Sequence, residues 1–407
     1  MAQEALLVEL GAASLANFTA RVLELRRRKV KVPPALPHYL FGTKGLVDAP
    51  EKIRVLGRGR YTRWDWSNED GETALHVAAA RLPIDGDNID WWFDNTVFDF
   101  VCNSKSGGKA MVMQDSQGQT PLHVAAENGQ VLLLDYFINC EAGKKAAAIK
   151  DNRGRYPLHI LAKNVPCGWG SDSVKSLVRK NKQAAAEQDS EGLCPIHRFG
   201  RDFKGEDEDE GPEHNEAVRL QALKNVERET PGRMKILDSH KRTVLHHACT
   251  HQYNKDCISS LEYIHKGNPA AMTAVDDRGD TVLSFAAANR LQRTTLEFIL
   301  SKYPQAVQMA NYSGDFPLHC AAGGAPLETV QLLFDKFKVA NRMQNGTGRL
   351  PWQCAKEADV RYFLLQQSPD SLSDTLLDIS RTWGGRVGTD TGKDPTTKTT
   401  KRKRGQI

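Results

Sequence analysis

One short pattern returns along most of the chain, and it constrains the fold more than any other feature of the sequence. Its fullest copy is Asp115–Ala126, which contains a turn-forming Asp-x-x-Gly followed by Thr-Pro-Leu-His and a pair of alanines. The place of His123 in this pattern occurs eight times, at residues 76, 123, 159, 197, 246, 284, 319 and 353. Successive copies are 34 to 49 residues apart, and this period predicts a solenoid in which each unit packs on its neighbours.

The residue types in the pattern predict how each unit folds. Thr120 is a good N-cap, and Pro121 suits the first helical position because the N–H there has no partner within the helix. The preceding turn needs a residue such as Gly118 that adopts positive φ. The alanine pair keeps the short helix thin, and the apolar run Val131–Phe137 predicts a second, longer helix. We therefore expect each unit to contain a turn and two helices.

The Thr-Pro-Leu-His-x-Ala signature resembles that of the ankyrin repeat, whose period is about 33 residues. The resemblance covers residues 68–367. The slightly long units, with segments such as Lys302–Ala306, are similar to the stretched ankyrin repeats frequent in algal protists. The resemblance to ankyrin repeats implies an all-α fold: an ankyrin-repeat solenoid of about eight helix-turn-helix units with short β-turn or hairpin tips. It also implies that the repeated histidine forms hydrogen bonds that tie adjacent turns together.

Some copies depart from the pattern. Ser284 and Gln353 replace the histidine, Lys241 replaces the glycine, and Phe199-Gly200 replaces the alanine pair. Four copies have Tyr, Cys, Phe or Leu at the cap, and all four place proline next, whereas three of the four threonine copies lack that proline. Either a threonine cap or a proline ring is thus expected to start each short helix. The fourth copy is the weakest match.

The chain is expected to have three regions. Residues 1–67 form a helical N-terminal region that caps the array, residues 68–367 form the repeats, and residues 368–407 form a flexible basic tail. Insertions are expected near 81–110 and 200–215, where the spacing between copies is longest.

Each insertion has two interpretations. In the first, Trp91 and Trp92 are expected to pack within an enlarged repeat, and the alternative is an anchor for a partner. In the second, Glu206–Glu210 is expected to be solvated, and the alternative is a docking site for a basic partner. A weaker hypothesis joins Trp91 and Trp92 with Trp64 and Trp66 as an aromatic cage for methylated lysine.

The net charge of +5 is a property of the tail, because residues 384–407 hold seven basic and two acidic residues. Nucleic-acid binding is therefore not expected except through the tail, where Lys401, Arg402, Lys403 and Arg404 are a candidate nuclear-localisation signal. No apolar run approaches the ~20 residues of a membrane span, and residues 1–25 do not resemble a signal peptide. The eight cysteines contain no C-x-x-C pair, which favours an intracellular location, nuclear or cytoplasmic.

The chain carries no nucleotide-binding or catalytic motif, so we expect neither an enzyme nor a cofactor. His246, His247, Cys249, His251 and Cys257 superficially resemble a metal cluster. His246 is however the repeated histidine, and Cys249 stands at the second alanine position, so no metal is expected.

The leading functional hypothesis is a non-enzymatic scaffold that binds other proteins. The ankyrin resemblance implies contacts through the turn tips and the exposed, concave face of the short helices. The candidate residues flank the turn glycines and are joined by two tryptophans: Gln117, Gln119, Arg153, Arg155, His240, Arg242, Arg278, Asp280, Tyr312, Arg349, Trp91 and Trp92. The alternatives are a nuclear, transcription-associated adaptor directed by the basic run, and an adaptor fused to an unrecognised enzymatic N-terminal region.

Overall fold

The computed structural model describes residues 6, 9–10, 12–28, 33–42, 52, 56, 63–81, 101–164, 170–201, 212–250 and 258–368. These residues are mostly helical and include no strand, which confirms the all-α prediction. Two isolated antiparallel bridges, Ser67–Thr73 and Val275–Thr281, are the β-type pairing found within the described ranges.

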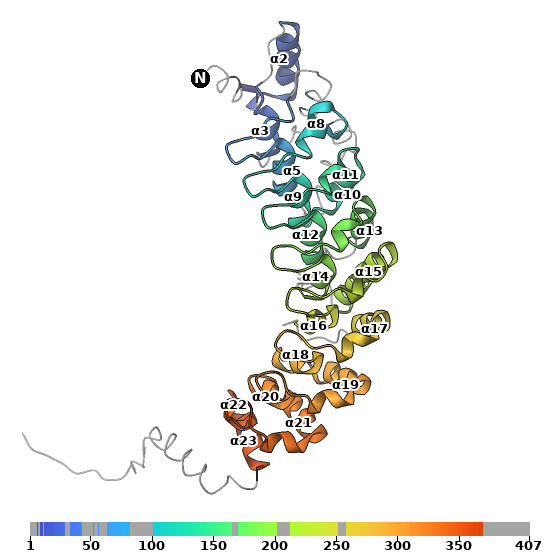
Figure 1. Ribbon diagram of the computed structural model, residues 1–407. Coiled ribbons are helices and arrows are strands. Elements are labelled where there is room, and N and C mark those ends of the chain that lie inside the picture. Colours follow the sequence, from blue (N-terminus) through green and yellow to red (C-terminus); the bar gives the residue numbers. More distant parts are fainter. Residues whose placement is uncertain are drawn as a thin grey trace, which may run out of the picture.

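Short inner helices form one row of an elongated stack, in which each helix contacts the next (Figure 1). In chain order they are α3 (Leu36–Gly42), α5 (Ala74–Arg81), α9 (Pro121–Glu127), α12 (Pro157–Lys163), α14 (Pro195–Arg201), α16 (Val244–Ala248), α18 (Val282–Ala288), α20 (Pro317–Ala322) and α22 (Pro351–Cys354). The turns that precede them project to the left in Figure 1.

Outer helices form a second row, which lies on the right of Figure 1 as far as α21, and from α10 onward each packs against the inner helix before it. They are α8 (Lys105–Ala110), α10 (Val131–Asn139), α13 (Gly170–Lys180), α15 (Pro212–Glu229), α17 (Ile258–Gly267), α19 (Arg293–Lys302), α21 (Leu327–Lys336) and α23 (Ala358–Gln366). Short helices follow several of them: α11 (Gly143–Ala146), η1 (Gln183–Ala185), η2 (Arg233–Lys235), η3 (Pro269–Thr273), η4 (Pro304–Gln308) and η5 (Lys338–Arg342).

The starts of the inner helices follow from the cap chemistry. Thr243 and Thr281 accept hydrogen bonds from backbone N–H groups in the first turn of α16 and α18. Four inner helices without threonine at the cap begin on proline instead: α12, α14, α20 and α22. The first N–H groups of a helix have no partner inside it. A threonine cap accepts a hydrogen bond from one of them, and a proline at the first position lacks that N–H altogether.

The core runs between the two rows. Leu122 and the alanine pair Ala125-Ala126 are fully buried, and Phe199 fills the corresponding place in the irregular fourth copy. Buried apolar residues continue from α2 (Leu15–Arg27) to α23, so that the stack shares one hydrophobic core. This is the arrangement that a solenoid needs, because no single unit can bury its own apolar face.

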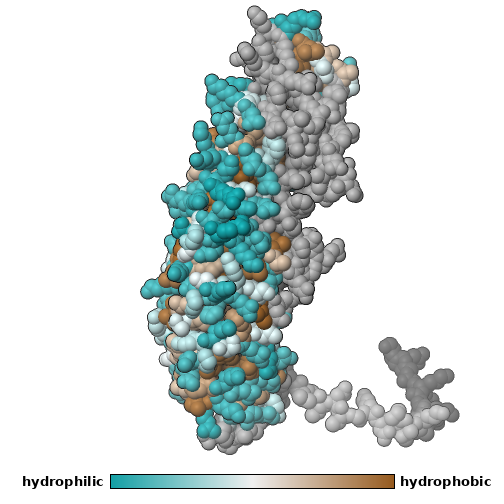
Figure 2. Space-filling model, turned by 90° about the vertical axis from the view of Figure 1, so that its right-hand side faces the viewer, coloured by the Kyte–Doolittle hydropathy of each residue, from teal (hydrophilic) through white to brown (hydrophobic). Residues whose placement is uncertain are grey.

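At the N-terminal end, α3 packs against α5. Phe18 and Val22 of α2 are fully buried, as are Leu36 and Leu40 of α3. The described part of the chain has no helix that is both long and apolar enough to cross a membrane. Figure 2 shows the face of the outer row, where hydrophilic side chains dominate the coloured surface and hydrophobic ones are scattered.

Several predictions fall on residues 82–100, 202–211 and 369–407, which lie outside the described residues. They concern Trp91 and Trp92, Glu206–Glu210 and the basic run Lys401–Arg404.

Candidate functional site

The turns ahead of the inner helices are held by one acidic or amide side chain each. Asp115 Oδ1 accepts hydrogen bonds from the backbone N–H groups of Gln117 at 2.9 Å and Gln119 at 2.8 Å. The same pair of bonds recurs at six further turns, formed by Asp151, Asp189, Asp238, Asp276, Asn311 and Asn345. Gly118 has φ +76°, whereas Lys241 adopts the same left-handed conformation with a side chain.

Neighbouring turns are joined through their backbones. Asn152 N–H donates to the carbonyl of Gln117 at 3.1 Å, and Ser190 N–H donates to that of Arg153 at 2.9 Å. Equivalent bonds link the turns from Asp70 to Gly346. The tips therefore form a continuous ladder, which holds the residues they expose in a fixed spacing.

The repeated histidine ties each turn to the next, as the resemblance implied. His123 Nδ1 accepts the backbone N–H of Thr120 at 3.1 Å, and its Nε2 lies 3.1 Å from the carbonyl oxygen of Arg155. Because an N–H can only donate, Nδ1 is unprotonated and Nε2 carries the hydrogen. Both bonds recur at five other histidines: His76, His159, His197, His246 and His319.

Burial opposes the charged form and lowers the pKa of five of these rings, at His123, His159, His197, His246 and His319. The pKa falls to about 4 at His123, His159, His197 and His246. The ring is therefore neutral at physiological pH, which is the state that the two hydrogen bonds require.

The candidate partner-binding residues divide into two groups. Those at the outermost part of a turn are exposed, and Tyr312 keeps 77% of its surface accessible. The other members of this exposed group are Gln117, Arg153, His240, Arg278 and Arg349. His240 Nδ1 pairs with Asp277 Oδ2 on the next turn at 2.9 Å.

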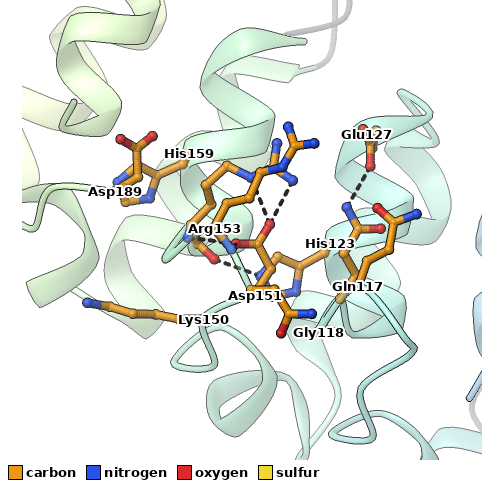
Figure 3. A network of polar contacts seen from close by, with 12 residues as sticks. Gln117, Gly118, His123, Glu127, Lys150, Asp151, Arg153, His159 and Asp189 are labelled. Atoms are coloured by element: carbon orange, nitrogen blue, oxygen red, sulfur yellow. Dashed lines mark hydrogen bonds and ion pairs between the residues drawn. The ribbon is translucent and has the colours of Figure 1, made fainter. Parts of the chain in front are cut away.

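The second group forms hydrogen bonds and ion pairs within the repeats instead of facing solvent: Gln119, Arg155, Arg242 and Asp280. Gln119 is only 5% exposed and donates to Glu127 at 2.8 Å. Arg155 donates to Asp151 through two nitrogens at 2.7 Å, in the network shown in Figure 3. Arg242 reaches Asp276 at 3.2 Å, and Asp280 accepts from Asn311 at 2.9 Å. All four precede the cap residue directly, but so does the exposed Arg349, so this position alone does not separate the two groups.

The inner-helix position after the repeated histidine is apolar in most copies and polar in two adjacent ones. It holds Val124 in α9 and Ile160 in α12, but Arg198 in α14 and His247 in α16. Arg198 Nε donates to Asp189 Oδ2 at 3.1 Å, and a second guanidinium nitrogen lies 3.4 Å from Glu191.

His247 makes the equivalent contact one repeat later. Its Nε2 donates to Asp238 Oδ2 at 2.8 Å. Burial raises the pKa of Asp238, but hydrogen bonds from His247 and from the backbone of Arg242 outweigh that effect and lower the pKa to about 2. The carboxyl group is thus ionised at neutral pH.

A groove of about 860 Å³ opens between the turn that precedes α14 and the turn that precedes α16. It is lined by residues 189–193 and 238–240, with Arg242, His247 and Thr250. His240 and Arg242 of this lining were among the sequence candidates, whereas the polar residues at the post-histidine position were a visible signal that was missed.

The metal interpretation of the histidine–cysteine cluster finds no support in the described residues. His246 is a turn-to-turn tie, Cys249 is fully buried, and His247 binds Asp238. In the described ranges no three His, Cys, Asp or Glu residues are placed to hold a metal ion. His251 and Cys257 lie outside those ranges.

The position of Val124 is held by Cys320 in α20 and by Cys354 in α22, and both cysteines are half-buried and pack against the core. The aromatic-cage hypothesis needs narrowing. Trp64 is 2% exposed, so its ring is not available to an aromatic cage.

One comparison with known proteins identifies the repeats over part of the chain. A family model described as ankyrin repeats (three copies) matches residues 93–190. No curated protein matches the chain.

Three solved structures are similar at low identity. The ankyrin repeat domain of human ASB11 is 17% identical, with a TM-score of 0.45, covering 61% of this chain and 98% of its own. The ankyrin repeat domain of Bcl-3, of the IkappaB family, is 22% identical, with a TM-score of 0.42, covering 61% and 99%. A chain from the complex of the predatory endopeptidase Bd0816 of Bdellovibrio bacteriovorus with the immunity protein Bd3460 is 23% identical, with a TM-score of 0.39, covering 52% and 97%.

The matched segment and the rest of the stack share one construction. The turn bonds and the start of the inner helix return in the turns and helices that follow this segment, and the histidine tie returns in α14, α16 and α20 but not in α18, which carries Ser284. The match to ankyrin repeats thus covers residues 93–190, and the described turns and inner helices beyond this segment are built in the same way.

Proposed function

We propose that this protein is an interaction scaffold that binds a partner protein along its turn tips and the adjacent face of the inner helices. The observation that carries the proposal is the ladder of joined turns, which presents exposed side chains at regular intervals. Arg153, Arg278 and Tyr312 are the strongest candidates, because arginine and tyrosine are enriched among residues that dominate binding energy.

The proposal includes the arrangement expected from the sequence, with a repeat array over 68–367 between an N-terminal region and a basic tail. Nuclear import through Lys401–Arg404 stays a prediction. So does an enzymatic role for the N-terminal region.

Affinity purification tests the proposal with two matched variants of the full-length chain. The tip variant combines Arg153→Ser, Arg278→Ser and Tyr312→Ser. The control variant combines Lys145→Ser on α11 with Lys336→Ser and Tyr362→Ser on the outer row, where Tyr362 is 61% exposed. Both should melt like the original protein, because surface substitutions change stability by about 0.5 kcal/mol or less.

The expected result is that proteins captured by the original chain and by the control variant are lost from the tip variant. Retention of the same proteins by the tip variant would contradict the proposal.

A further inference from the structure

We infer that the groove between the turns that precede α14 and α16 binds an arginine side chain of the partner protein. This inference rests on the proposed function and names the chemistry that one part of the surface recognises. It is carried by three observations: a polar substitution at two buried positions, an excess of carboxylates, and one buried acceptor without a donor.

The substitution is confined to the two inner helices that border the groove. Arg198 is 4% exposed and His247 is 1% exposed, although the same position is filled by Val124 and Ile160 in the preceding helices. Burying a charged or polar group in place of an aliphatic one costs free energy unless the group is paired. The repeats of α14 and α16 therefore bury a charged or polar side chain at a position where the preceding repeats fold with an aliphatic one.

The charge around the groove is negative. The groove-lining residues, their ion-pair partners and the tip residue Lys241 carry five carboxylates and three permanent positive charges: Asp189, Glu191, Asp238, Asp276 and Asp277 against Arg198, Lys241 and Arg242. Glu191 is the most accessible of the carboxylates that line the groove, with 52% of its side chain exposed. A cationic group entering the groove gains from this excess, and an anionic one is opposed by it.

The third observation concerns a single atom. His247 lines the groove and donates from Nε2 to Asp238, while its Nδ1 is buried and has no hydrogen-bond partner. When Nε2 alone carries the hydrogen, Nδ1 can only accept, and the partner that it lacks is a donor. A buried acceptor left unpaired costs about 1–3 kcal/mol, and a ligand that supplies an N–H removes this cost.

Arginine fits these demands better than lysine. Its planar guanidinium group offers five N–H donors, which can reach a carboxylate and a second acceptor at once. Glu191, on the turn before α14, and His247, on α16, offer these two kinds of group in the lining of the groove. The groove volume of about 860 Å³ leaves room for the side chain together with flanking backbone.

The test uses the full-length protein and four fluorescent peptide libraries with randomised flanks. The central residue is fixed as arginine, lysine, citrulline or glutamate, and binding is followed by fluorescence anisotropy. Citrulline keeps the shape of arginine but lacks its charge. The arginine library should bind at least about tenfold more tightly than the citrulline library, which corresponds to about 1.4 kcal/mol.

Two substitutions locate the site. His247→Phe should weaken binding of the arginine library several-fold. Glu191→Gln, on an exposed side chain whose change does not threaten folding, should do the same. The matched control Glu127→Gln changes an exposed acid outside the groove and should leave the affinity unchanged.

Equal binding of all four libraries, preference for glutamate, or equal effects of Glu191→Gln and Glu127→Gln would each overturn the inference. These outcomes leave the proposed function standing if the tip variant still loses its cellular partners. Conversely, arginine preference together with partner retention by the tip variant would overturn the proposed function alone.

Discussion

The repeats that contain α9 and α12 and those that contain α14 and α16 share one scaffold but present different faces. In both pairs an aspartate holds the turn and a histidine ties it to the next turn. The residue after the histidine is Val124 or Ile160 in the first pair and Arg198 or His247 in the second. The scaffold depends on backbone bonds and on the histidine position, so the next position can carry charge when its own turn supplies a carboxylate.

The largest expected effect is one that both pairs share. Each pair contains two histidines whose pKa is lowered from 6.5 to about 4 in the folded state. The unfolded chain therefore binds protons first, and stability present above pH 6.5 is lost as the pH falls toward 4. Each histidine contributes a slope on the order of 1 kcal/mol per pH unit, so the four together remove several kcal/mol.

Urea unfolding followed by circular dichroism at pH 7, 6 and 5 measures this loss. The raised pKa values of Asp135 and Asp280 act in the opposite direction but involve fewer groups. Equal stability at the three pH values would show that the histidines are not held neutral.

A buried charge should be equally disruptive in either pair. Leu122 and Ile196 occupy the same fully buried position in α9 and α14. Leu122→Asp and Ile196→Asp should each destabilise the array by several kcal/mol, because an unpaired carboxylate replaces an aliphatic group in the core. Differential scanning calorimetry provides the measurement. An unchanged melting curve for either variant would show that its residue is not part of a core that the two pairs share.

Arg198 should matter through its partner. Arg198→Met leaves Asp189 buried without its guanidinium and should cost about 3 kcal/mol. Adding Asp189→Asn keeps an oxygen for the turn N–H groups and removes the stranded charge, so the double variant should regain most of that loss. The comparison of the single and double variants by urea unfolding sharpens the difference between the two pairs. A double variant as unstable as the single one would mean that the ion pair itself holds the turn.

The smallest expected effect is at the tip of the turn before α16. Lys241 has φ +58°, where a side chain is unfavourable, and every other turn from Gly71 to Gly348 places glycine there. Lys241→Gly should stabilise the protein by about 1 kcal/mol. Gly118→Ala is the control with opposite sign, since its Cβ would lie 2.7 Å from the backbone nitrogen of Asn152. Thermal melting of both variants gives the answer, and a destabilised Lys241→Gly protein would show that the lysine side chain serves the turn.

Much of the scaffold could be predicted from the sequence because its determinants are local. The turn glycine, the cap residue and the proline act within a few residues of one another. Thr243 and Pro157 therefore predict where the inner helices α16 and α12 begin. The histidine tie was also predictable, although its partner lies in the next turn, since the ankyrin signature implies it.

The side-chain contacts at the surface could be predicted from the sequence less well than the scaffold. Arg155 and Gln119 look like exposed turn residues, yet their side chains fold back onto Asp151 and Glu127. The bond between Arg198 and Asp189 spans nine residues and forms only because the turn folds back over the helix. Side chains that meet through such turns are fixed by packing, which a periodic pattern does not specify.

The claim that both pairs of repeats share one scaffold is tested most directly by the protonation of four side-chain rings. Nitrogen-15 NMR of imidazole groups, recorded from pH 7.5 to 4.5, reports which ring nitrogen carries the hydrogen and where each ring titrates. We predict that His123, His159, His197 and His246 all remain protonated on Nε2 alone across most of this range, with pKa values of about 4. Titration of His197 and His246 near pH 6.5, with His123 and His159 unchanged, would contradict the shared scaffold.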